Sequence, residues 1–117
     1  MGDTEPTIST HVLDTERGMP ASGIRVSLYR RSGTEERLVG EGTTDTDGRI
    51  RRLLAENLTA GAYRLVFDLR GSNVPAEGGT PSFFTSLSVE LHVSDTTRSY
   101  HVPLLLAPYS LTTYRGS

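Results

Sequence analysis

Apolar and polar side chains alternate along much of this 117-residue chain, and this period of two limits what it can fold into. In the clearest example, Leu87–Ser94, every second residue is Leu or Val and the residues between are Ser, Glu and His. Successive side chains of a β-strand point to opposite faces, so the pattern predicts a strand with one buried face. Similar alternation predicts further strands over 24–29 and 63–69, with weaker candidates at 7–13, 37–43, 49–51, 100–106 and 109–114.

Glycine- and proline-rich turn signals separate these segments, at 17–20, 31–33, 46–48 and 59–61. Seven or eight short strands at this spacing predict an all-β fold, a two-sheet antiparallel sandwich that forms one domain over residues 1–117. The segment Gly71–Pro81 holds three glycines and two prolines, so we expect an exposed loop there and at most one short helix in the chain. Residues 1–6 are expected to be flexible.

Composition excludes several kinds of chemistry. The chain has no cysteine, which excludes disulfides, thiolate metal sites and cysteine nucleophiles, and all 12 basic residues are arginine, which excludes lysine Schiff bases. Fourteen acidic residues are spread among the arginines, so we expect no nucleic-acid partner. No apolar run approaches the length of a membrane-spanning helix, and the acidic N-terminus has no apolar leader segment. We therefore expect a protein with no membrane partner, located in the cytoplasm.

The three histidines differ in their neighbours. His11 points opposite to Ile8 and Val12 on an extended backbone, and taken alone it is typical of a histidine on a strand surface. His101 also points away from the predicted core, but its outward neighbours Pro103 and Leu105 are apolar, which indicates an interface or the floor of a pocket. His92 alternates with polar residues and is expected to be solvated.

No metal site is predicted. The histidines lack the short spacing of zinc ligands. The segment Asp45–Arg49 resembles the start of a calcium loop, but the glutamate needed six residues after Gly48 is replaced by Leu54, and Arg49 would add positive charge. A hairpin-type turn at Asp47-Gly48 that projects Arg49 is the simpler interpretation.

Four segments together resemble the 5-hydroxyisourate hydrolases, also called transthyretin-like or transthyretin-related proteins. They are Ser9–Asp14 (Ser-Thr-His-Val-Leu-Asp), Thr44–Ile50 (Thr-Asp-Thr-Asp-Gly-Arg-Ile), His101–Leu106 (His-Val-Pro-Leu-Leu-Leu) and the terminal Tyr114–Ser117 (Tyr-Arg-Gly-Ser). The resemblance covers nearly the whole chain and implies a transthyretin-like (prealbumin-like) sandwich. Departures from the family pattern fall at Thr85, Ser99 and Leu111 and within 71–81.

The resemblance implies a hydrolase of purine degradation that opens the ring of 5-hydroxyisourate, the product of urate oxidation, at its N1–C6 bond. It also implies that no cofactor is needed and that the chain forms a homotetramer, a dimer of dimers, with the site in a channel between dimers. The implied catalytic residues are His11, Arg49, His101 and Ser117, and the implied substrate-binding residues are His11, Arg49 and Tyr114.

Residue chemistry agrees with that reaction. Imidazoles with an ordinary pKa of about 6.5 suit proton transfer to and from water and a leaving nitrogen, and an arginine suits developing negative charge on oxygen. The sequence leaves open which histidine is the base. Two alternatives also remain, a transthyretin-like carrier that binds a small molecule without catalysis and a purely structural module.

Overall fold

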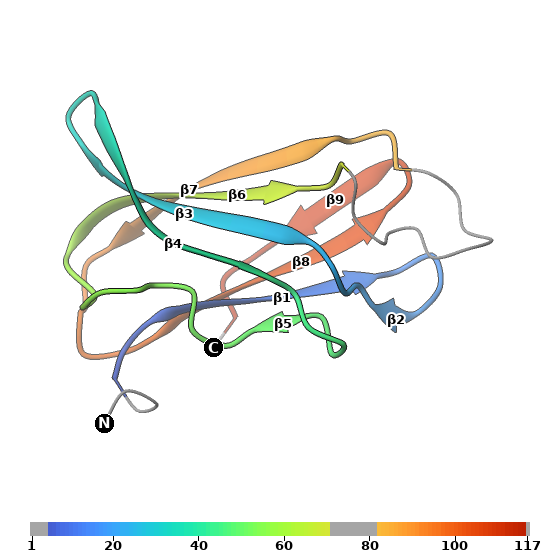
Figure 1. Cartoon of the computed structure of the whole chain (residues 1–117), viewed down its shortest axis with the longest axis horizontal. Helices are drawn as coiled ribbons and strands as arrows, with labels where there is room; N and C mark the ends of the chain where they lie inside the picture. Colours follow the sequence, from blue (N-terminus) through green and yellow to red (C-terminus); the bar gives the residue numbers. More distant parts are fainter. Residues whose placement is uncertain (1–4, 71–81, 117) are drawn as a thin grey trace.

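The computed structural model describes residues 5–70 and 82–116, which form a sandwich of two β-sheets and contain no helix (Figure 1). The strands in chain order are β1 (Ile8–Asp14), β2 (Met19–Pro20), β3 (Arg25–Ser32), β4 (Glu35–Thr43), β5 (Arg49–Ile50), β6 (Gly61–Asp68), β7 (Ser86–Val93), β8 (Tyr100–Ala107) and β9 (Ser110–Thr113). The predicted loop at 71–81 lies outside the described residues, as does most of the predicted flexible segment 1–6.

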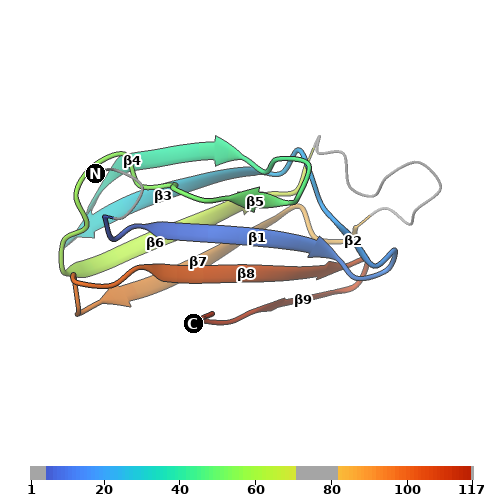
Figure 2. The same cartoon turned by 90° about the horizontal axis from the view of Figure 1, so that it is seen from below.

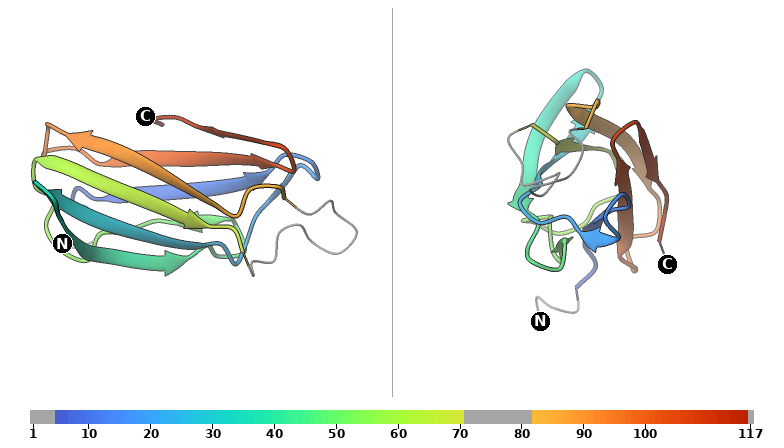
Figure 3. Two further views of the ribbon diagram at one scale, coloured as in Figure 1. Left: turned by 90° about the horizontal axis from the view of Figure 1, so that it is seen from above. Right: turned by 90° about the vertical axis from the view of Figure 1, so that its right-hand side faces the viewer.

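Each sheet uses strands from both halves of the chain. Sheet A has the order β2-β1-β8-β9, with β5 pairing to β1 next to β2, and sheet B has the order β4-β3-β6-β7. Figure 2 shows β5, β1, β8 and β9 side by side, and the end-on view in Figure 3 shows the two layers facing each other.

The predicted all-β sandwich is confirmed, and the structure corrects two details of it. The described residues form nine strands rather than seven or eight, because the exposed two-residue strand β2 forms by pairing with β1 and has no alternation of its own. The sheets are not wholly antiparallel, since β1 and β8 run parallel over seven residue pairs from Ile8–Tyr100 to Asp14–Leu106.

The parallel pair β1–β8 is fixed by burial of its inner face. Val12 and Leu104 are partners in this register and are both fully buried. Complete burial of such a side chain contributes about 1.5–3 kcal/mol. The buried Thr10 hydroxyl donates a hydrogen bond of 2.6 Å to the carbonyl of Val102, which satisfies a polar group that the core would otherwise leave unpaired. Alternate residues of both strands consequently face outward.

A tight turn carries the chain from β4 in sheet B to β5 in sheet A. The Asp45 carboxylate accepts hydrogen bonds from the backbone N–H groups of Asp47 at 2.8 Å and Arg49 at 3.0 Å. Gly48 has φ of +76°, a conformation that only glycine adopts at little cost. Asp47-Gly48 forms the predicted bend, but the strands on either side belong to different sheets and so do not form a hairpin.

We expect Gly48→Ala to destabilise the fold more than Gly33→Ala does. Both glycines have positive φ, but a Cβ at Gly48 would lie 2.5 Å from the Val12 carbonyl oxygen, whereas a Cβ at Gly33 meets nothing within 4 Å. The shared backbone strain costs about 1–2 kcal/mol at each position, and Gly48 adds a steric clash. Urea unfolding of the two variants measures the difference, and equal losses would show that the contact with Val12 has no effect.

Candidate active site

Three of the predicted site residues lie in neighbouring positions on the outer face of sheet A. His11 on β1 pairs directly with Arg49 on β5, and Ser9, two residues earlier on β1, pairs directly with His101 on β8. Because β1 runs between the other two strands, it brings the guanidinium and both imidazoles together. All three side chains are half-buried.

A hollow of about 400 Å³ lies beside this group. It is lined by Ser9, Thr10, Arg49, Ile50, Arg51, Ser99 and His101. This lining contains two guanidinium groups, an imidazole and hydroxyl groups but no carboxylate. Such a set of donors suits a ligand rich in carbonyl oxygens or carrying negative charge.

Arg49 is held by its backbone and leaves its guanidinium available. Its N–H donates to the Asp45 carboxylate at 3.0 Å, and its carbonyl accepts a bond of 3.1 Å from the Asp45 N–H. Within the described part of the chain, no side chain forms a hydrogen bond or ion pair with the Arg49 guanidinium. The turn therefore places the guanidinium on the sheet face with no side chain of the described residues hydrogen-bonded to it.

The surroundings of His101 favour its neutral form. Burial lowers the pKa of the His101 imidazole below its ordinary value of 6.5, and the neighbouring charges of His11 and Arg49 lower it further. On Asp45, the hydrogen bond from the Arg49 N–H is the main cause of a lowered carboxyl pKa, so this turn residue stays ionised at neutral pH. The site thus combines a neutral imidazole with a permanent cation.

The C-terminal segment reaches the same face. The Gly116 N–H donates a hydrogen bond of 2.7 Å to the His101 carbonyl, and the two residues form an isolated antiparallel bridge. Tyr114, which was predicted to bind substrate, is 52% exposed and is not among the residues that line the hollow beside His101. The predicted catalytic Ser117 follows Gly116 in sequence but lies outside the described residues.

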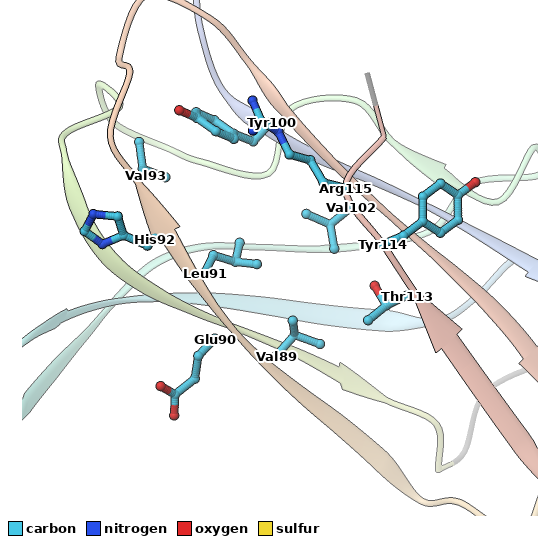
Figure 4. Close-up of a pocket in the computed structure, with 10 residues that line it drawn as sticks. All are labelled: Val89, Glu90, Leu91, His92, Val93, Tyr100, Val102, Thr113, Tyr114 and Arg115. Atoms are coloured by element: carbon cyan, nitrogen blue, oxygen red, sulfur yellow. The ribbon is translucent and has the colours of Figure 1, made fainter.

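A second hollow, of about 340 Å³, lies between the edge strands β7 and β9 and has a different character (Figure 4). Val89, Leu91 and Val102 contribute much of its apolar lining, and Tyr114 also borders it. His92 is exposed on β7, as the sequence predicted; it also lines this hollow and belongs to the other sheet from His11. We do not assign this hollow as the active site, because it lacks Arg49 and His101, which both line the first hollow; His11 lines neither of the two.

The described residues contain no group of three or more histidine, aspartate or glutamate side chains placed to hold a metal ion. They also contain no helix that is long and apolar enough to cross a membrane.

Sequence reasoning predicted Arg49 and His101 and missed the other five lining residues of the hollow, which are Ser9, Thr10, Ile50, Arg51 and Ser99. Ser9 and His11 are two positions apart, as are Arg49 and Arg51, so the alternation that places one member of each pair outward also places the other. Ser99 accepts a hydrogen bond of 3.0 Å from the Thr7 N–H. Ser99 is also two positions before His101, so the same alternation places the two on one side of the chain.

This geometry defines the class of protein. It is a transthyretin-type sandwich that carries two imidazoles and a guanidinium on the outer face of one sheet. Residues 8–116 match the model of the HIUase/Transthyretin family, and the chain belongs to that family.

Relatives in this family include several named enzymes. The chain is 40% identical over 113 residues to the 5-hydroxyisourate hydrolase of Caulobacter vibrioides, covering 94% of this chain and 97% of the relative. It is 42% identical over 118 residues to the 5-hydroxyisourate hydrolase of Deinococcus radiodurans, covering 96% and 97%.

Solved structures give the same picture of the fold. Klebsiella pneumoniae 5-hydroxyisourate hydrolase superposes with a TM-score of 0.79 at 35% identity, covering 96% of this chain and 99% of that one. Sea bream transthyretin in complex with thyroxine superposes with a TM-score of 0.81 at 28% identity, covering 93% of each chain. The family's sandwich is therefore shared by a protein with a bound hormone and by hydrolases.

We expect the His101 ring to titrate below pH 6.5, and the Arg49→Gln variant to titrate at higher pH than the wild type. Removing the guanidinium removes a cation that disfavours the imidazolium, so the pKa of His101 rises toward its ordinary value. NMR titration of the ring protons measures both midpoints. Arg25→Gln is the control, because Arg25 lies on sheet B and pairs with Glu41, and it should leave the midpoint unchanged. An unshifted midpoint in Arg49→Gln would show that the two groups are not coupled.

Proposed function

We propose that this protein hydrolyses 5-hydroxyisourate, opening the six-membered ring at the N1–C6 bond to give 2-oxo-4-hydroxy-4-carboxy-5-ureidoimidazoline. The observation that carries the proposal is the placement of Arg49, His11 and His101 on one sheet face by the pairing of β5, β1 and β8. Membership of the HIUase/Transthyretin family and identity of about 40% to named hydrolases support it. The cytoplasmic location and the lack of a cofactor stay predictions from sequence.

Ring opening needs an activated water, stabilisation of an oxyanion and a proton for the leaving nitrogen. His101 suits the role of base because its lowered pKa leaves a nitrogen unprotonated near neutral pH. It takes one proton from water while the water oxygen bonds to C6. The Arg49 guanidinium, which has no ion-pair partner among the described residues, stabilises the negative charge that develops on the C6 oxygen.

His11 then serves as the acid. The C6–N1 bond breaks, its electron pair stays on N1, and His11 supplies the proton that this nitrogen needs. The base His101 has gained a proton and the acid His11 has lost one, so transfer through solvent restores both. Water is the only co-reactant, and its oxygen ends in the new carboxyl group.

We include the terminal segment in the site. Gly116 is bonded to the His101 carbonyl, and Ser117 is the next residue in the chain, so we propose that Ser117 contributes its hydroxyl to binding water or substrate. Tyr114, exposed two residues earlier, is proposed to contact substrate when a second subunit narrows the site.

A carrier function is the alternative, and the similarity to sea bream transthyretin in complex with thyroxine favours it. A carrier has no evident need for a neutral imidazole beside a second imidazole and an unpaired guanidinium. Thyroxine binding without turnover of 5-hydroxyisourate would support the carrier and overturn the proposed hydrolase.

We also propose that the protein is a homotetramer, a dimer of dimers. The strands β7 and β9 end their sheets and have backbone groups available for pairing, with the apolar hollow between them. On the outer face of sheet A, Leu13 and Leu105 point the same way as the site residues and are only half-buried. Edge pairing is proposed to form the dimer, and packing of two sheet A faces is proposed to form the tetramer around the site.

Substitution of the site residues is expected to abolish most of the activity. His11→Ala, Arg49→Ala and His101→Ala should each lower kcat/KM by about 10²- to 10⁴-fold, because each removes a proton-transfer or charge-stabilising group. The absorbance decay of freshly generated 5-hydroxyisourate measures turnover, corrected for the decay without enzyme.

The matched control for these variants is Arg25→Ala, which removes an exposed arginine from the central strand β3 of sheet B. It should keep wild-type activity, and thermal unfolding should show that all four variants fold. A variant of His11, Arg49 or His101 with full activity would remove that residue from the proposed mechanism.

Leu105→Glu is expected to split the tetramer and lower activity. A carboxylate placed in an apolar subunit interface loses its hydration, which disfavours association. Light scattering of the wild type should give about four times the chain mass of 12.7 kDa, and the variant should give about half of that. The control is Leu38→Glu, at a position 48% exposed on β4, which should stay tetrameric. A wild type that is active as a monomer would contradict the proposed assembly.

A further inference from the structure

The His101 imidazole is held on two of its edges by residues that no step above uses. On one edge, the Ser9 hydroxyl and His101 Nδ1 share a hydrogen bond of 2.8 Å. On the other edge lies Gly116, where an added Cβ would come within 2.8 Å of His101 Cδ2. Within the described residues, Nε2 is therefore the ring nitrogen that has no hydrogen-bond partner.

The contact with Ser9 follows from the fold. Ser9 and His101 are partners in the parallel pairing of β1 with β8, 92 residues apart in sequence, and both face outward. In the part of the chain that the structure describes, the Ser9 hydroxyl makes no other hydrogen bond. Its position is set by the buried inner face of the same strand, where Ile8 and Thr10 are fixed in the core.

We propose that Ser9 is a positioning residue for the hydrolysis, whose Oγ accepts a hydrogen bond from His101 Nδ1–H and so holds the imidazole in the tautomer with a bare Nε2. This rests on the proposed function, in which His101 is the base. A histidine can accept a proton from water only through an unprotonated nitrogen, so the tautomer decides whether Nε2 acts as base or as donor.

A hydroxyl at this position has a chemical advantage over a carboxylate. When Nε2 takes a proton, the ring becomes an imidazolium, and the Nδ1–H bond to Ser9 becomes charge-assisted and stronger. A carboxylate would do the same but would also raise the pKa of the resting ring, so that it would hold a proton before water arrives. Ser9 orients the ring without adding a charge. His11 and Arg49 therefore still lower the pKa of His101.

Gly116 completes the slot for the ring. The absence of a side chain lets the Gly116 backbone approach closely enough to bond the His101 carbonyl at 2.7 Å while the imidazole lies beside it. A side chain there would push the ring away from Ser9 or push the terminal segment off β8. Position 116 of the terminal Tyr-Arg-Gly-Ser is a glycine because any side chain there would occupy the space of the His101 ring.

The test compares Ser9→Val with Ser9→Thr, two β-branched side chains of nearly equal size of which only Thr keeps a hydroxyl. Both suit a strand, so a difference between them reports the hydroxyl alone. For a metal-bound histidine, losing the hydrogen-bond partner of the ring lowers metal affinity or activity by about 10- to 100-fold. We expect kcat of Ser9→Val to fall by a similar factor while KM stays within about twofold of the wild type. Ser9→Thr should retain most of the activity, and Ser27→Ala, which removes a half-buried serine from β3, should retain all of it.

A second readout does not depend on turnover. Nitrogen-15 NMR of the ring at a pH where it is neutral should show the wild-type proton on Nδ1 and a mixture of tautomers in Ser9→Val. A wild-type ring with its proton on Nε2, or a Ser9→Val variant with wild-type kcat, would overturn the proposal. If the wild type has no hydrolase activity, the proposed function fails, and the same spectra still decide whether Ser9 holds the ring.

Discussion

The parallel pairing of β1 with β8 is the constraint on which the site depends. It aligns residues about 90 positions apart so that Ser9 meets His101, and it places His11 next to both. The inner face of the same pairing is closed by Val12 and Leu104, so the burial that stabilises the sandwich also fixes the relative positions of the imidazoles. A shift of one residue in this register would turn the histidine of one strand toward the core while the other still faced outward.

The electrostatic character of the site comes from a few neighbours rather than from a dense charge network. Ion pairs such as Arg64–Glu36 and Arg37–Glu56 lie on sheet B or beside it, where they neutralise one another. On the outer face of sheet A, the Arg49 guanidinium has no such partner in the described residues, and it acts together with burial to keep His101 neutral. Arginines on sheet B thus form ion pairs with acidic side chains, whereas Arg49 on sheet A helps to keep His101 neutral.

Much of this could be predicted from the sequence, and the limits have physical causes. Alternation located eight of the nine strands and the outward direction of His11 and His101, because burial of one face leaves a local pattern. It could not predict the parallel pairing or the contact of Ser9 with His101, because register between distant strands is set by packing of the whole core. Met19–Pro20 was missed because both residues are exposed and form a strand only by pairing with Leu13 and Asp14 at the end of β1. The roles of His11, Arg49, His101, Tyr114 and Ser117 stay predictions.

The Arg49 guanidinium is positioned by the turn at Asp45–Arg49, whereas the imidazoles of His11 and His101 are positioned by long strands. His11 and His101 belong to long central strands that the sandwich cannot lose, whereas Arg49 stands on a strand of two residues after a bend that is fixed by one carboxylate and one glycine. The position of the guanidinium therefore depends on the residues of one turn, whereas the positions of the imidazoles depend on the core of the whole sandwich. The same sandwich occurs in sea bream transthyretin in complex with thyroxine, so the scaffold alone does not fix the ligand.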